Sequence, residues 1–159
     1  MAISFREILD MFKSGKTTAK NHIKNLIELA CADGKFTEEE NELLISIAAR
    51  NGISINRIND IKAGETKVLF GVPKTDSEKF SQIYDLVRMM LADQNIHPEE
   101  VRVSELFASR FGYPKGAIKG MVETIQHNII NGNDVENTYE RVVYYFKVNQ
   151  LRLSAVKAR

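Results

Sequence analysis

Acidic side chains that recur at one spacing are the residues of this sequence best suited to chemistry. They fall in two short stretches, Asp33, Glu39 and Glu40 in the first, and Asp93, Glu99 and Glu100 in the second. Carboxylate oxygens can bind a divalent cation, but calcium takes roughly six to eight oxygens, so one stretch would need water or the other stretch. The spacing also differs from that of an EF-hand loop. Alternatively, these side chains only cap helices and interact with helix dipoles.

No other group of residues has the arrangement of a catalytic site. Cys31 completes an apolar stripe of helical period, which favours a place in the core over a role as nucleophile or metal ligand. The three histidines are far apart, and none belongs to a His-Glu-x-x-His motif. We therefore predict no catalytic and no cofactor-binding residue. A metal-dependent enzyme that uses the paired acidic clusters is the alternative, and only the clustering of the carboxylates favours it.

The elements that must position the carboxylates form an internal repeat. A constant shift of 60 positions superposes residues 22–53 on residues 82–113 without a gap. Fixed spacing over such a length is typical of a structural repeat. The matched pairs include Ile23 with Ile83, Leu26 with Leu86, Ala32 with Ala92, Asp33 with Asp93, Ala48 with Ala108, Arg50 with Arg110 and Gly52 with Gly112.

Each copy of the repeat predicts a helix, a short turn and a second helix. Apolar residues recur at helical spacing in the first helix of each copy, from Ile23 to Cys31 and from Ile83 to Leu91. Thr37 and Glu40 form a capping box before the second helix of the first copy, whereas Pro98 takes the first helical position in the second copy. Because the turns are short, each copy should be an antiparallel helical hairpin with one apolar face.

Further helices flank the two hairpins. Residue pairs with capping-box spacing predict three helix starts, Ser4 with Glu7, Thr75 with Glu78, and Asn133 with Glu136. The expected flanking helices are an opening helix with the stripe Phe5, Ile8, Leu9 and Phe12, a short helix over residues 54–62, a long helix from Pro114 to Asn131, and a terminal helix over residues 134–156. Residues 63–75 contain Gly64, Gly71 and Pro73 and predict an extended connector.

Two glycines in the predicted long helix indicate close packing. Gly116 and Gly120 lie four residues apart on one face, where each costs about 1 kcal/mol relative to alanine. We therefore expect another helix to approach this face closely.

These patterns predict an all-α fold. Two pseudo-repeated antiparallel helical hairpins should pack together along their apolar faces, with additional flanking helices that bring the total to about seven or eight. The chain length of 159 residues fits a single domain over residues 1–159. Its expected parts are repeat 1 over 18–62, the connector over 63–75, repeat 2 over 76–131 and the terminal helix over 134–156.

Composition excludes several classes of function. Twenty-two basic and 21 acidic residues leave a formal charge of +1, which gives no long-range field to attract nucleic acid. No segment approaches the roughly 20 apolar residues of a membrane helix, and the first residues lack the apolar stretch of a signal peptide. The single cysteine forms no internal disulfide. We therefore expect a cytoplasmic protein with no integral membrane segment and no nucleic-acid partner.

One string in the first copy resembles the TerB-like family, which is named for a tellurite-resistance protein. It runs Leu29-Ala30-Cys31-Ala32-Asp33-Gly34-Lys35-Phe36-Thr37-Glu38-Glu39-Glu40 and continues at Ala48-Ala49-Arg50-Asn51-Gly52-Ile53. The second copy is similar at Met90-Leu91-Ala92-Asp93 and at Glu99-Glu100, so the resemblance covers residues 18–130. It implies an all-helical fold of paired repeats and a role in stress response without established catalysis.

The same resemblance implies a set of metal ligands. The acidic turn residues of the family are suggested to bind divalent cations, which would carry over to Asp33, Glu39, Glu40, Asp93, Glu99 and Glu100. The second copy departs from the pattern, because Gln94 stands where the first copy has Gly34. A divalent cation is thus the one cofactor that the resemblance suggests.

The terminal helix carries apolar residues beyond one buried stripe. Its aromatic side chains are Tyr139, Tyr144, Tyr145 and Phe146, and its basic ones include Lys147 and Arg152. Such a helix is the preferred candidate surface for a protein partner or a homodimer. The sequence therefore favours a noncatalytic TerB-like stress-response or regulatory interaction module that senses or binds divalent cations through its acidic turns.

Overall fold

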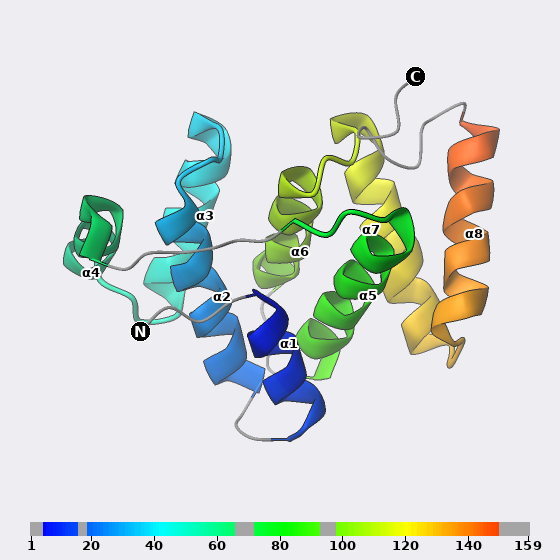
Figure 1. Cartoon of the computed structure of the whole chain (residues 1–159), viewed down its shortest axis with the longest axis horizontal. Coiled ribbons are helices and arrows are strands. Elements are labelled where there is room, and N and C mark those ends of the chain that lie inside the picture. The colour runs from blue at the N-terminus through cyan, green and yellow to red at the C-terminus, as the bar shows by residue number, and fades with distance from the viewer. Residues whose placement is uncertain (1–4, 16–18, 66–71, 93–97, 150–159) are drawn as a thin grey trace. The chain divides into compact units, whose positions relative to one another are not determined.

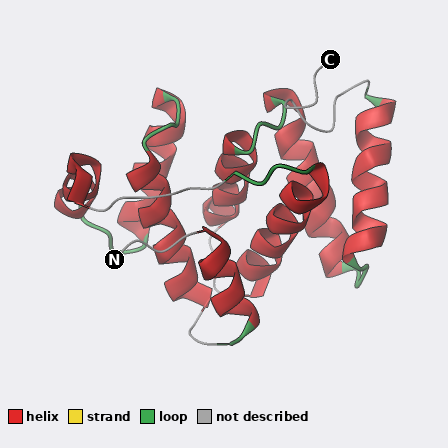
Figure 2. Cartoon of the chain, viewed as in Figure 1, coloured by secondary structure: helices red, strands yellow, loops and turns green. Residues whose placement is uncertain are grey.

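A computed structural model describes residues 5–15, 19–65, 72–92 and 98–149 of the chain (Figure 1). Within these ranges the chain forms helices and no strand, which confirms the all-α prediction (Figure 2). The helices are α1 (Phe5–Lys13), α2 (Ala19–Asp33), α3 (Glu38–Arg50), α4 (Ile55–Asp60), a π-helical turn η1 (Ile61–Glu65), α5 (Asp76–Ala92), α6 (Pro98–Arg110), α7 (Lys115–Ile130) and α8 (Val135–Val148).

The chain divides into two compact units. Met1–Gly71 and Ala92–Val103 form the first unit, and Val72–Leu91 and Ser104–Arg159 form the second. The first unit therefore holds α1 to α4, whereas the second holds α7, α8 and nearly all of α5. Helix α6 is shared between the two units.

Helix α2 is the centre of the first unit, because it contacts α1, α3 and the η1 turn. Its apolar stripe is buried, as the repeat period predicts, and comprises Ile23, Leu26, Ile27, Ala30 and Cys31. A turn over residues 34–37 connects α2 to α3, and the two helices pack as the predicted hairpin. In the second copy Ile83 and Leu86, the equivalents of Ile23 and Leu26, are also buried. Leu91 is partly exposed, whereas its equivalent Cys31 is buried.

The predicted capping box at the start of α3 is confirmed. The Thr37 N–H donates to Glu40 Oε1 at 2.9 Å, and the Glu40 N–H donates to Thr37 Oγ1 at 3.2 Å. At the start of α5, Thr75 Oγ1 accepts a hydrogen bond from the Glu78 N–H at 3.1 Å. Local hydrogen bonds of this kind satisfy backbone donors that the first helical turn leaves without partners.

Both copies of the repeat end their second helix with the same geometry. In α3 the Ile53 N–H donates to the Ala48 carbonyl at 2.9 Å, and Gly52 has a φ of 77°. In α6 the Tyr113 N–H donates to the Ala108 carbonyl at 3.2 Å, and Gly112 has a φ of 95°. Only glycine adopts such a φ without strain, so Gly52 and Gly112 have the C-terminal capping role that the sequence predicts.

The second unit is built on α5, α7 and α8. Helix α7 packs along α8, whose buried residues are Thr138, Val142 and Phe146. Helix α5 is buried around most of its circumference. Its buried residues are Lys79, Phe80, Gln82, Ile83, Tyr84, Asp85, Leu86, Val87, Met89 and Met90. This burial includes a lysine, an aspartate and a glutamine, residue types that are rarely placed in a protein interior.

The two glycines of α7 differ in their surroundings. A Cβ atom at Gly120 would overlap the side-chain hydroxyl of Tyr145 from α8, so this glycine permits the predicted close approach. At Gly116 an added Cβ would meet no atom within 4 Å, and the residue is exposed. The prediction is therefore confirmed for Gly120 and wrong for Gly116, which lies in the first turn of α7.

Two predicted boundaries need correction. Helix α8 is capped by Asp134, whose Oδ1 accepts from the Asn137 N–H at 2.8 Å, and not by Asn133. The Asn133 side chain instead donates to Asn128 Oδ1 at 2.6 Å. Helix α4 ends at Asp60 and continues as the η1 turn to Glu65, so residues 63–65 are not part of an extended connector. Three predictions lie outside the described residues: the part of the connector over residues 66–71, the end of the terminal helix over residues 150–156, and the helix cap at Ser4.

Candidate functional site

The first acidic stretch lies at the turn between α2 and α3. Asp33 is the last residue of α2 and is half-buried, and Glu39 is exposed in the first turn of α3. Glu40 is half-buried and completes the capping box with Thr37. Carboxylates in the first turn of a helix also interact favourably with its positive end. The structure therefore gives Glu40 a capping role.

The second acidic stretch is described only in part. Asp93 and the side chain of Glu100 lie outside the described residues. Glu99 lies in the first turn of α6, and its Oε1 is 3.7 Å from Arg50 Nη2. Both side chains of this ion pair are about 40% exposed, at 38% for Arg50 and 41% for Glu99, so the pair contributes little to stability.

A metal-binding cluster is not found in the described part of the chain. Among those residues, no group of three or more histidine, cysteine, aspartate or glutamate side chains lies close enough to hold an ion. The six-residue ligand set implied by the family resemblance thus stays a prediction, since Asp93 and the side chain of Glu100 are not described.

Cys31 lies in the core, in agreement with its place in the apolar stripe. Its side chain is buried, and burial raises the pKa of the thiol from 9.0 to about 11, with a smaller opposing effect of Lys62 and a small further rise from Glu28. A thiol with this pKa is protonated at neutral pH, and only the thiolate is a good nucleophile or metal ligand. Cys31 is therefore suited to packing.

Exposed apolar side chains gather on α8 and at the end of α7. Six large apolar side chains are exposed in the described residues, and five of them belong to this region, namely Ile130, Val135, Val143, Tyr144 and Val148. Tyr144 and Val148 are one helical turn apart and are 68% and 58% exposed. They lie on the face of α8 opposite the stripe Thr138, Val142 and Phe146, which packs inward. We call Tyr144 and Val148 the outer face of α8.

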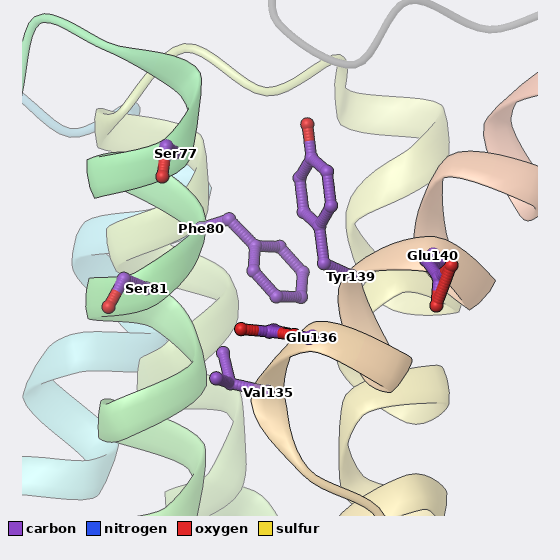
Figure 3. Close-up of a pocket in the computed structure, with 7 residues that line it drawn as sticks. All are labelled: Ser77, Phe80, Ser81, Val135, Glu136, Tyr139 and Glu140. Carbon is purple, nitrogen blue, oxygen red and sulfur yellow. The ribbon is translucent and has the colours of Figure 1, made fainter.

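A groove of about 490 Å³ separates α5 from α8 within the second unit (Figure 3). Its floor is formed by the aromatic rings of Phe80 and Tyr139, whose centroids are 5.0 Å apart at an interplanar angle of 74°. In Figure 3 the Glu136 carboxylate extends from α8 toward α5 below the Phe80 ring, and Glu140 lies farther out. The lining residues of this α5–α8 groove are Ser77, Phe80, Ser81, Val135, Glu136, Tyr139 and Glu140.

The charge of the α5–α8 groove is negative. Its lining includes two glutamates and no basic residue. Glu136 and Glu140 are one helical turn apart, and within the described part of the chain neither forms an ion pair or a side-chain hydrogen bond. Sequence reasoning missed this groove, although the spacing of Ser77 with Ser81 and of Glu136 with Glu140 places each pair on one helix face.

Among known proteins, neither a family model nor a curated protein nor a solved structure matches this chain. No helix in the described ranges is both long and apolar enough to cross a membrane, as expected from the composition.

Proposed function

We propose that this chain is a noncatalytic, TerB-like interaction module of the stress-response or regulatory kind. The observation that carries the proposal is the concentration of exposed apolar side chains on α8 and at the end of α7. Apolar side chains that gather on one region of a surface, with an aromatic residue among them, are typical of interfaces. The outer face of α8 is the surface on which a protein partner or a second copy of the chain would dock.

The module acts by binding and not by catalysis. Cys31, the only thiol, is buried and protonated at neutral pH, so it supplies no nucleophile. A helical scaffold with an exposed Tyr144 supports recognition, because tyrosine gives a large contact area with few rotatable bonds. In the TerB-like interpretation this recognition would couple the module to a cellular response such as resistance to tellurite.

Paired substitutions test the proposed surface. Tyr144→Glu with Val148→Lys removes the outer face of α8, and Ile55→Glu removes an exposed apolar side chain from α4 in the first unit. The association state is measured by light scattering over a range of concentrations, and partners are captured from the native cell with both variants and the wild type. Loss of self-association or of a specific partner only in the α8 variant is expected. A monomeric wild type that captures the same proteins as the α8 variant would refute the proposal.

The acidic turns are proposed to bind a divalent cation, which would make the module a sensor. The described carboxylates that support this are Asp33 at the end of α2 and the exposed Glu39 at the start of α3. A cation that binds only the folded state at 100 times its Kd stabilises it by about 2.7 kcal/mol. For a chain of this size that gain corresponds to a rise in Tm of roughly 5–10 °C.

Thermal unfolding with calcium, magnesium, manganese or zinc, each against a chelator, measures that rise. Asp33→Asn with Glu39→Gln should abolish it, whereas Glu42→Gln, an exposed glutamate farther along α3, should leave it unchanged. If no cation moves the transition of the wild type, the sensing role is excluded.

A further inference from the structure

The α5–α8 groove carries an inference that is independent of the outer face of α8 and of the acidic turns. Its volume of about 490 Å³ lies within the range of roughly 300–1,000 Å³ that is common for small-molecule sites. It also combines an aromatic floor with polar groups, as such sites usually do. All seven lining residues belong to the second unit.

The two carboxylates of the groove point to a positively charged ligand. Glu136 and Glu140 repel each other across one turn of α8, and like charges at this spacing destabilise a helix. In the described residues the basic neighbour Arg141 forms no ion pair with either carboxylate, and its Nε donates to Asn137 Oδ1 at 3.1 Å. A cation held between these carboxylates would remove the repulsion and gain charge-assisted hydrogen bonds.

The aromatic floor favours an organic cation over a metal ion. Tyr139 is partly exposed, and its ring is held edge-to-face by the buried ring of Phe80, next to the Glu136 carboxylate (Figure 3). The faces of phenyl and phenol rings attract ammonium and guanidinium groups, and their carbon atoms pack against an alkyl chain. Ser77 and Ser81 add hydroxyl groups on the α5 side that can accept hydrogen bonds from such a ligand.

We propose that the α5–α8 groove binds an alkyl-linked guanidinium or ammonium group. The charged end would pair with Glu136 and Glu140, and the alkyl chain would lie on the partly exposed ring of Tyr139, which the buried Phe80 ring supports from below. Such a group occurs both in free alkylamines and in the arginine and lysine side chains of a polypeptide, and the lining of the groove fits the chemistry that both share.

Titration of the whole chain with butylguanidinium tests the proposal. Amide NMR shifts should change saturably at the lining residues, and N-butylurea, which has a similar shape but no charge, should bind at least about tenfold more weakly. A blocked Gly-Arg-Gly peptide, measured in the same way, distinguishes the source of the ligand. Binding of only the free compound indicates a small molecule, and binding of only the peptide indicates a partner's side chain.

Matched variants separate the groove from general charge effects. Glu136→Gln should weaken butylguanidinium binding about tenfold, and Glu140→Gln should weaken it less, because Glu140 lies farther out. Glu123→Gln removes an exposed carboxylate from α7 and should leave the affinity unchanged. Equal binding of the neutral urea, equal affinity in all three variants, or the absence of saturable shifts in the millimolar range would overturn the proposal.

Discussion

Substitution of the two glycines of α7 by alanine tests how tightly α7 packs against α8. An alanine in a helix is more stable than a glycine by up to about 1 kcal/mol. At Gly116 the new methyl group meets no atom within 4 Å, so Gly116→Ala should raise the free energy of unfolding by roughly 0.5–1 kcal/mol. This substitution provides the reference for the backbone effect alone.

At Gly120 the same gain is opposed by a steric overlap. The new methyl group would overlap the Tyr145 hydroxyl and lie 2.5 Å from its Cζ atom, so the tyrosine ring must move. Overpacking of this kind costs roughly 1–3 kcal/mol. The Tyr145 ring packs edge-on against the Phe146 ring, with 5.7 Å between the ring centroids. Because Phe146 is buried, displacement of the Tyr145 ring disturbs the buried side of α8. Gly120→Ala should lower the free energy of unfolding by roughly 0–2 kcal/mol.

Removal of the Tyr145 ring should reverse the sign of the effect that Gly120→Ala has on the free energy of unfolding. In a Tyr145→Ala background, Gly120→Ala has room for its methyl group and should stabilise the chain about as much as Gly116→Ala does. The expected coupling between positions 120 and 145 is thus roughly 1–3 kcal/mol. Urea unfolding followed by far-UV circular dichroism measures all four members of the cycle. The described packing of α7 on α8 is refuted if Gly120→Ala stabilises the wild type as much as Gly116→Ala.

Three further predictions concern single side chains. Thr37→Ala removes the N-cap of α3 and should cost about 1 kcal/mol in urea unfolding; an unchanged midpoint would contradict the role of the capping box. Native Cys31 should react slowly with a disulfide reagent at pH 8 and rapidly after unfolding. Equal reaction rates in the native and unfolded states would disprove the burial of Cys31. Because burial raises the pKa of the thiol to about 11, the contribution of this group to stability is complete below pH 9 and is lost between pH 9 and 11. Tyr113→Phe should leave stability unchanged or raise it, because the buried Tyr113 hydroxyl has no hydrogen-bond partner in the described residues; a loss above about 1 kcal/mol would reveal one.

The features that the sequence predicted well are those that depend on neighbouring residues. Thr37 and Glu40 are three positions apart, so their reciprocal hydrogen bonds follow once the helix begins between them. Gly52 and Gly112 end their helices for an equally local reason, since each accepts a positive φ. The buried stripe from Ile23 to Cys31 follows from helical period alone.

Features that depend on distant residues could not be predicted in the same way. Gly116 and Gly120 look equivalent in the sequence, and only the position of Tyr145 on another helix distinguishes them. Asn133 and Asp134 are both good N-cap residues, but the bond from Asn133 to Asn128 on α7 leaves the cap to Asp134. This choice depends on how the preceding helix ends.

The α5–α8 groove was not predicted for a related reason. Phe80 and Tyr139 are 59 positions apart, and each alone fits the apolar stripe of its own helix. The groove exists because the aromatic rings of two helices meet edge to face while the neighbouring glutamates stay in solvent. No pattern within either helix specifies that meeting.

The burial of α5 on most of its sides has a consequence for how the chain opens. Between Lys79 and Met90 only the side chains of Ser81 and Arg88 reach solvent, so solvent cannot reach most peptide groups of this helix by local opening of one face. Its amide hydrogens should exchange with deuterium only through opening of the whole second unit, whereas those of α8, which is exposed along Tyr144 and Val148, should exchange earlier through local opening. Protection of α5 is therefore a direct readout of how cooperatively that half of the molecule is held together.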